Sequence, residues 1–205
     1  MDKLRLADVR NLYEYEKTRD AFRREIIALK ARRRVPVGDR LSFLFENRAT
    51  VLFQIQEMVR AERIAADDRI QDEIDVYNAL IPDPGELSAT MMIEIEDQSL
   101  IQPELDRLMG IDSGEYVWLQ IGRDLAVAGA FEEGHSKEDK IAAVHFVRFP
   151  LSPEARLHGH HERHIDLVQQ RPDGRSRGGR FKRQPRRLAA RPDAPKHGSR
   201  GPARF

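Results

Sequence analysis

The chain has 205 residues, 34% of them charged, and a formal net charge of +1 at pH 7. It contains no cysteine, which excludes structural disulfides, thiol catalysis and metal centres held by cysteine. No apolar stretch approaches the roughly eighteen residues that a membrane-spanning helix needs. Residues 1–6 do not resemble a signal peptide, so we expect a cytoplasmic protein.

The near-neutral total hides two parts of opposite charge. Residues 171–205 hold twelve basic and two acidic residues, a net charge of +10, which leaves −9 for residues 1–170. Large apolar side chains are too few in the last part of the chain to offset the entropy lost on ordering. We therefore predict one domain over 1–156 and a disordered tail over 157–205, rich first in His and then in Arg, Gly and Pro.

The first half of the chain predicts mainly helices. Asn11 is a helix cap, and apolar residues at steps of three and four predict a helix over 12–33. Its basic end, residues 30–34, suits the negative end of the helix dipole, although the alternative is a nucleic-acid stripe. A strand over 41–46 follows. Further helices are predicted over 48–64 and from 67 or 68 to 81.

The second half predicts mainly strands. Residues 87–96 alternate between apolar and polar, which indicates a half-buried strand, and Pro103 opens a short helix that Gly110 ends. Strands near 115–121 and 125–132 are joined by a hairpin turn. The strand over 141–149 is apolar on both faces, so we expect it to be central or covered. This pattern predicts an α+β fold, with a mainly antiparallel sheet of about five strands packed with three to four helices.

The second helix carries the most informative polar residues. Its predicted core stripe consists of Val51, Leu52, Ile55, Met58 and Val59. Glu62 falls within the same arc, where a carboxylate must be paired, protonated or at the edge of the core. Phe53 and Ile64 form a second apolar patch on the opposite side. Four polar residues flank this patch: Gln56, Glu57, Arg60 and Arg63.

Two interpretations of this helix stay open. It packs between two layers, with its arginines paired to nearby acids, or it presents a docking face or polar site. Paired carboxylates can also serve acid–base chemistry or bind a hard metal ion. The candidate residues are Phe53, Gln56, Glu57, Arg60, Glu62, Arg63, Glu73 and His145. No complete catalytic signature accompanies them, and we predict no cofactor.

The histidines favour structural or incidental roles. His145 lies in an apolar strand, where a hydrogen-bonded core residue is more typical than a metal ligand. Glu132 and His135 have the spacing of a carboxylate-bundle site, but they lie in a turn and have no second copy. A cluster in the tail can hold a metal ion only adventitiously, because no scaffold fixes its geometry. Its members are His158, His160, His161 and His164.

The tail itself has two interpretations. Residues 177–180 read Arg-Gly-Gly-Arg and precede Phe181, a pattern similar to RNA-binding arginine-glycine segments. The alternative is a nonfunctional C-terminus, such as a GC-rich coding frame read out of register, which would supply the same residue types.

Several segments match a known family. They are the run over 44–64, which contains Gln54-Ile55-Gln56-Glu57-Met58, and the shorter runs 70–73, 77–78, 80–82, 86–90, 136–139 and 143–146. Over residues 1–156 these segments resemble DUF3501, a bacterial domain-of-unknown-function family. The family has no established activity. Its members are often encoded beside rubrerythrin-like and iron–sulfur oxidoreductase proteins, which implies an accessory role in redox or peroxide handling. Members usually continue with another strand after the one over 141–149, where this chain has its polar tail.

Three hypotheses follow. The first is a non-enzymatic cytoplasmic accessory protein that docks on a redox partner through the second helix. The second is a small carboxylate-based enzyme or metal-binding protein that uses Glu57, Arg60, Glu62, Glu73 and His145. The third is nucleic-acid binding through the basic tail.

Overall fold

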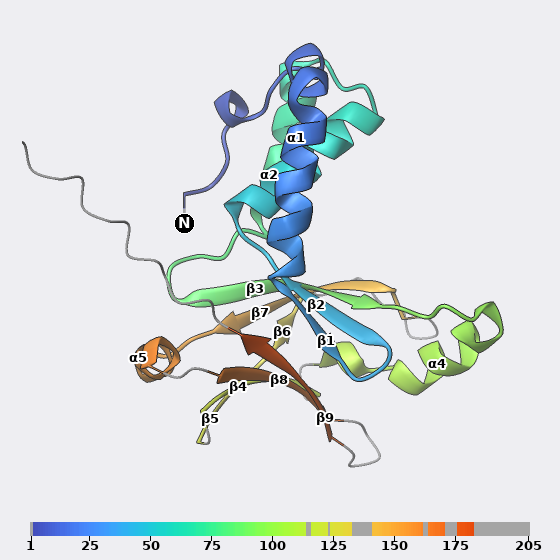
Figure 1. Ribbon diagram of the computed structural model, residues 1–205, viewed down its shortest axis with the longest axis vertical. Coiled ribbons are helices and arrows are strands. Elements are labelled where there is room, and N and C mark those ends of the chain that lie inside the picture. The colour runs from blue at the N-terminus through green and yellow to red at the C-terminus, as the bar shows by residue number, and fades with distance from the viewer. Residues whose placement is uncertain are drawn as a thin grey trace, which may run out of the picture.

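A computed structural model describes residues 2–113, 116–122, 124–132, 141–161, 164–170 and 176–182 (Figure 1). Its α-helices are α1 (Leu12–Ala31), α2 (Arg48–Ala61), α3 (Asp67–Asn78), α4 (Ile101–Leu108) and α5 (Pro153–His161). Short 3-10 helices are η1 (Leu6–Asp8), η2 (Gln98–Leu100) and η3 (Ile111–Ser113). No helix in these ranges has both the length and the apolar composition to cross a membrane.

The strands form two antiparallel sheets. The first has five strands in the order β1 (Arg34–Val37), β2 (Leu41–Phe45), β3 (Glu86–Ile93), β7 (Val144–Pro150) and β6 (Ala130–Phe131). The second has the order β5 (Leu125–Ala128), β4 (Val117–Ile121), β8 (His164–Gln170) and β9 (Ser176–Lys182). The predicted α+β class and the five-stranded antiparallel sheet are confirmed. The second sheet is an addition to that prediction.

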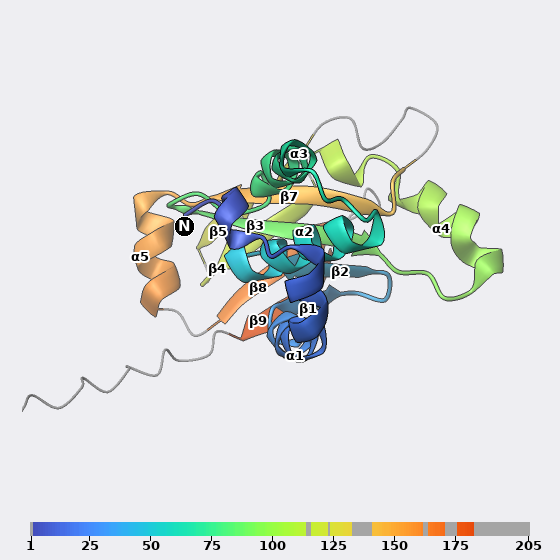
Figure 2. The ribbon, with the colours of Figure 1, turned by 90° about the horizontal axis from the view of Figure 1, so that it is seen from above.

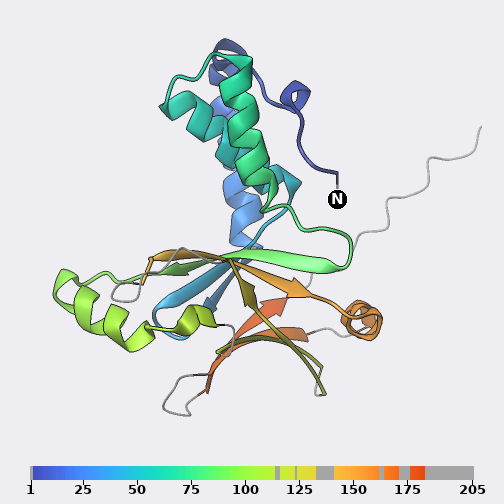
Figure 3. The ribbon, with the colours of Figure 1, turned by 180° about the vertical axis from the view of Figure 1, so that it is seen from behind.

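The two sheets lie one above the other and enclose the larger core (Figures 1 and 3). Alternation along β2 and β3 places Phe43, Met91 and their apolar neighbours on the inner face. Val117, Leu119 and Ile121 of β4 meet them from the second sheet. As predicted, the strand that follows residue 141 is central, because β7 lies between β3 and β6.

The first three helices stand on the outer face of the five-stranded sheet, and α2 lies between α1 and α3 (Figures 1 and 2). Val51, Ile55 and Val59 of α2 form a second core with Ile70 and Ile74 of α3. This core is separate from the core between the sheets, and Phe146 of β7 packs against it from the outer face of the sheet.

The helices end earlier than predicted. α1 begins after Asn11, whose side chain accepts a hydrogen bond from the Glu14 amide as expected of a cap, but it ends at Ala31 rather than 33. α2 ends at Ala61 rather than 64, because Arg63 adopts a left-handed backbone with φ of 55°. Glu62 therefore lies outside the helix and is exposed, which corresponds to the edge-of-core alternative.

The strand predicted over 125–132 is wrong as a single element. β5 pairs with β4 in the second sheet, whereas β6 pairs with β7 in the first. The chain crosses between the sheets at Gly129, whose amide donates to the Val117 carbonyl at 2.8 Å. A Cβ at this position would lie 2.8 Å from Cγ2 of Val147, so the crossing needs a residue without a side chain.

The domain boundary predicted at residue 156 falls inside α5. Beyond it, β8 pairs along β4, and β9 pairs along β8. The composition of a glycine- and arginine-rich segment does not reveal such strands. Strands pair through backbone N–H and C=O groups, and every residue except proline supplies both groups. Residues 162–163, 171–175 and 183–205 of the predicted tail lie outside the described residues.

Candidate functional site

An open groove lies in the corner between the upright helices and the outer face of the five-stranded sheet. Its volume is about 460 Å³. The residues that line this sheet–helix groove are Lys30, Arg34, Leu44, Glu46, Phe53, Gln54, Glu57, Met58, Ala61, Tyr77, Thr90, Met92 and Val144. Two of the predicted site residues, Phe53 and Glu57, are among them.

Strand alternation builds the floor of the groove. Inward positions of β2, β3 and β7 fill the core between the sheets, so Leu44, Met92 and Val144 lie on the outer face. Antiparallel pairing places Met92 directly opposite Val144. Val144 is 44% exposed. The floor is therefore an apolar surface that the helical bundle leaves partly open.

α2 forms the wall, with Phe53 at its centre. The Phe53 ring meets the ring of Phe22 on α1 edge to face, with centroids 5.7 Å apart. The ammonium group of Lys30 lies 5.3 Å from the Phe53 centroid. Met58, expected in the core stripe, is half-buried and lines the groove. Ile64, expected beside Phe53, instead packs on the core of the helices.

The Glu57 carboxylate is held by α1. It accepts hydrogen bonds from Nε and Nη2 of Arg19, both at 2.8 Å, and from the Tyr15 hydroxyl at 2.7 Å. The bonds from Arg19 are the main reason that the pKa of Glu57 is lowered. Burial raises the pKa of Tyr15, and its hydrogen bond to Glu57 adds to the effect. Glu57 thus fixes the packing of α1 on α2.

Two other predicted site residues also join α2 to the preceding segment. Arg60 makes a bidentate ion pair with Glu16, with Nε–Oε2 at 2.8 Å and Nη2–Oε1 at 3.0 Å. The buried Gln56 accepts from the Arg10 amide at 2.8 Å and donates to the Arg10 carbonyl at 3.1 Å. Neither residue lines the groove. Their contacts correspond to the interpretation in which the polar residues of α2 pair with a neighbouring layer.

The remaining acidic candidates lie on the α3 side. Glu73 is half-buried on α3, and Glu62 and Arg63 are exposed just after α2. Burial raises the pKa of Tyr77, which lines the groove, and the negative charges of Glu73 and Glu62 raise it further. A hydrogen bond with Gln54 acts in the opposite direction.

The sequence analysis missed the deepest polar residue of the groove, Glu46. Its side chain is 3% exposed, and it accepts hydrogen bonds from the hydroxyls of Thr90 at 2.7 Å and Thr50 at 2.5 Å. Nearby, Arg33 donates to the backbone carbonyls of Phe45 and Glu46. Burial lowers the pKa of Arg33, and the charge of Glu46 opposes that shift. A usable signal was the position of Glu46 directly after β2, where it continues the outward-facing series of Leu44, four residues before Thr50.

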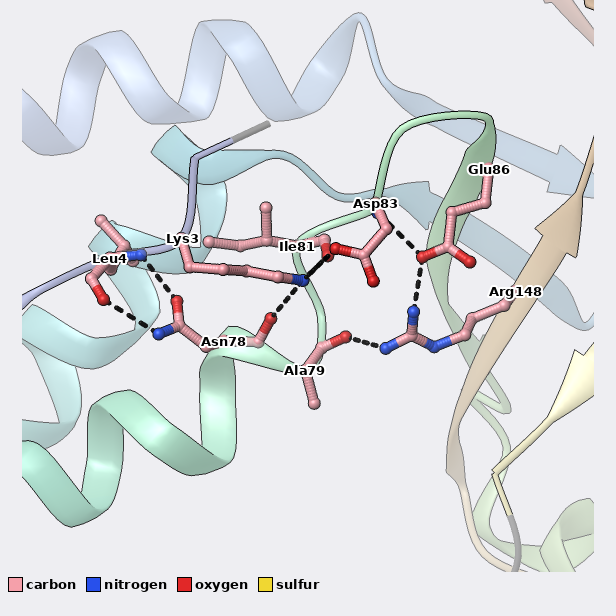
Figure 4. Close-up of polar contacts among 8 residues, drawn as sticks. All are labelled: Lys3, Leu4, Asn78, Ala79, Ile81, Asp83, Glu86 and Arg148. Carbon is pink, nitrogen blue, oxygen red and sulfur yellow. Dashed lines mark hydrogen bonds and ion pairs between the residues drawn. The ribbon is translucent and has the colours of Figure 1, made fainter.

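A polar network holds α3 in place above the sheet (Figure 4). Lys3 donates to the Ile81 carbonyl at 2.7 Å and forms an ion pair with Asp83 at 2.9 Å. Both backbone groups of Leu4 bond to the Asn78 side chain, at 2.8 and 2.9 Å. On the sheet side, Arg148 bonds to Glu86 at 2.5 Å and to the Ala79 carbonyl. These contacts fix the α3–β3 connection and, with it, the Tyr77 side of the groove.

His145 lies away from the groove, although it belongs to β7. It points into the core between the sheets and is fully buried. Its Nε2 lies 2.8 Å from the Ala142 carbonyl oxygen, and its Nδ1 lies 3.6 Å from Oδ2 of Asp112. This geometry corresponds to a hydrogen-bonded core histidine. The structure therefore does not bring His145 together with the polar residues of α2.

The other histidine candidates fall outside what the structure describes. His135 lies in an undescribed stretch, as do the side chains of His158, His160, His161 and His164. Within the described ranges, no group of three or more His, Asp or Glu side chains has an arrangement that suits a metal ion.

Comparison with known proteins places the chain in a family without a known activity. Residues 3–176 match the model of a family described as proteins of unknown function, DUF3501. A crystal structure of a novel protein of unknown function from Burkholderia pseudomallei has a TM-score of 0.80 and 31% sequence identity; the match covers 87% of this chain and 93% of that chain. No curated protein matches the sequence. The match over residues 3–176 confirms the resemblance, and the chain belongs to the DUF3501 family.

Proposed function

We propose that this chain is a non-enzymatic accessory protein of the cytoplasm that binds a redox protein through the sheet–helix groove. The observation that carries the proposal is the composition of that groove. An apolar floor of Leu44, Met92 and Val144 meets the aromatic side chain of Phe53, and the groove stays open between the helices and the sheet. Partly exposed aromatic and apolar surface of this kind is typical of sites that anchor a partner.

The contacts of α2 argue against an enzyme built on its polar residues. A general base needs a lone pair that is free to take a proton. Glu57 accepts three hydrogen bonds from α1, and Arg60 is bound to Glu16 through two. Chemistry at either residue would first require breaking the contacts that hold α1 against α2. The same contacts keep the Phe53 side of α2 in a fixed position, which suits a binding surface.

The redox nature of the partner rests on the family association alone. The cysteine-free chain has no thiolates with which to hold an iron–sulfur cluster, so a redox centre of that kind would belong to the partner. The basic tail is left out of the proposal, because residues 183–205 lie outside the described part of the chain.

Site-specific photo-crosslinking in the native host tests the proposal. A photoreactive residue replaces Val144, which is 44% exposed on the groove floor, or Val76, which is 68% exposed and does not line the groove. We expect the Val144 position to crosslink a redox protein, Phe53→Ala in the same chain to weaken that crosslink, and the Val76 position to give none. Equal products from both positions, or none from Val144, would remove the groove as the docking site.

A further inference from the structure

We propose that the occupant of the sheet–helix groove is a segment of the partner protein that inserts an arginine or lysine side chain toward Glu46. This inference rests on the proposed function, which it deepens by naming the chemistry of the anchor.

Two of the four charged residues that line the groove are neutralised within the chain. The Glu57 carboxylate accepts hydrogen bonds from Nε and Nη2 of Arg19, each at 2.8 Å. Arg34 forms an ion pair with Glu94 at 2.7 Å. An occupant therefore gains little by pairing with Glu57 or Arg34, because it would have to displace an internal partner.

The other two charged residues are Glu46 and Lys30. The Glu46 carboxylate takes one hydroxyl hydrogen bond on each oxygen, from Thr90 and Thr50, and among the described residues no cation forms an ion pair with it. Arg33 lies close enough for the charge of Glu46 to act on its pKa, but it directs its donors to backbone carbonyls and not to the carboxylate. A carboxylate has about four acceptor positions, so about two stay open on Glu46. Burying a carboxylate is costly unless a cation or further donors compensate it.

The surroundings favour a cation over a neutral donor. The Glu46 side chain is only 3% exposed. The groove that it lines also contains the apolar and aromatic side chains of Leu44, Phe53 and Met92. The alkyl stem of an arginine or lysine matches such walls, while its charged head reaches the carboxylate. At the α3 side, the negative charges of Glu73 and Glu62 act on Tyr77, which lines the same groove.

Lys30 sets the second feature of the segment. Its ammonium group lies over the Phe53 ring, and no carboxylate in the described ranges pairs with it. A segment that carries an acidic residue beside its basic anchor satisfies Lys30 and Glu46 together. The groove therefore fits a peptide of mixed charge with one deep cation.

Alkyl fragments that mimic single side chains test the inference on the unmodified full-length chain. The probes are n-hexylguanidinium, n-hexylamine, n-hexanol and hexanoate, titrated while the amide signals of Glu46, Thr90 and Met92 are followed by NMR. We expect the two cations to bind about tenfold more tightly than hexanol, the gain of about one charge-assisted hydrogen bond. We expect hexanoate to leave these amides unchanged. Equal binding of hexanol and the cations, or no binding of either, would overturn the inference.

Two variants test whether the preference for cations arises at Glu46. Glu46→Gln keeps the size of the side chain and removes its charge, so it should abolish the preference for cations. Glu16→Gln removes an exposed carboxylate that does not line the groove, and it should leave that preference unchanged. Loss of the preference in both variants would contradict a site at Glu46. Because the fragment comparison is made on the wild-type chain, it stands even where Glu46→Gln does not fold.

The outcomes separate this inference from the proposed function. A crosslink from Val144 without a cation preference overturns the arginine or lysine anchor and leaves docking intact. A cation preference without a crosslink overturns docking. Spermidine is titrated as a further probe. If it binds at Glu46 far more tightly than n-hexylguanidinium, the natural occupant is a free polyamine, and the proposal of a protein side chain is overturned.

Discussion

Truncating Phe53 and Ile55 should affect stability very differently, although both residues lie on α2. Ile55 is fully buried in the core of the helices, where Ile→Ala changes cost about 2–5 kcal/mol. Phe53 is half-buried, with one ring contact to Phe22 and one face on the groove. A fully buried Phe→Ala change costs about 3–5 kcal/mol, so the partial burial of Phe53 reduces its expected cost to about 1–2 kcal/mol.

Urea unfolding of Phe53→Ala and Ile55→Ala measures both losses under the same conditions. We expect the two variants to keep the denaturant dependence of the wild type and to differ in midpoint, with Ile55→Ala the less stable. Phe53→Ala should nevertheless weaken the groove crosslink, because aromatic anchors contribute about 2 kcal/mol or more to binding. Equal, large losses of stability in both variants would show that Phe53 serves mainly as core, and the docking hypothesis would fall.

Three further predictions concern the fold. Because the pKa of Glu57 is lowered in the folded protein, its charge contributes stability at pH 7, and this contribution is lost as the pH falls below about 4.3 and through the folded pKa. The difference in unfolding free energy between wild type and Glu57→Gln should therefore shrink over that range. A difference that does not depend on pH would contradict the ion pair with Arg19. Gly129→Ala should destabilise by about 1–3 kcal/mol through the clash with Val147, measured by thermal unfolding, whereas the exposed Ala128→Gly should cost less. A chain truncated after residue 182 should have the melting temperature of the full chain. A chain truncated after residue 156 should be strongly destabilised, because it lacks β8 and β9. Equal melting temperatures for the two truncated chains would show that β8 and β9 contribute nothing to stability.

The sequence predicted the parts of the fold that repeat locally. Alternation over 87–96 identified β3 and the residues it buries, and Asn11 marked the start of α1. The sequence did not reveal that residues 125–132 divide between two sheets. The need for glycine at position 129 arises from its contact with Val147, which exists only in the folded protein. The strand β8 was hidden for a similar reason, because its partner β4 lies far away along the chain.

The candidate site was predicted in part. Helical periodicity placed Phe53 away from the core stripe, and Phe53 does line the groove. The partners of Glu57 and Arg60 come from α1, a segment that no spacing rule connects to α2. Glu46 was missed because its role depends on Thr90, which β3 brings beside it only in the folded sheet. Such contacts between distant segments carry no periodic signal.

The order of the strands has a consequence for how the chain is made. β3 pairs on one side with β2 and on the other with β7, where Met92 meets Val144 across a long intervening segment. During synthesis the helices and the β1–β2–β3 meander emerge first, with β3 as an exposed edge until β7 leaves the ribosome. Contacts of such long range form slowly. The edge of β3 is therefore unpaired during this part of synthesis, and it is the side on which we expect another nascent copy to pair before β7 arrives.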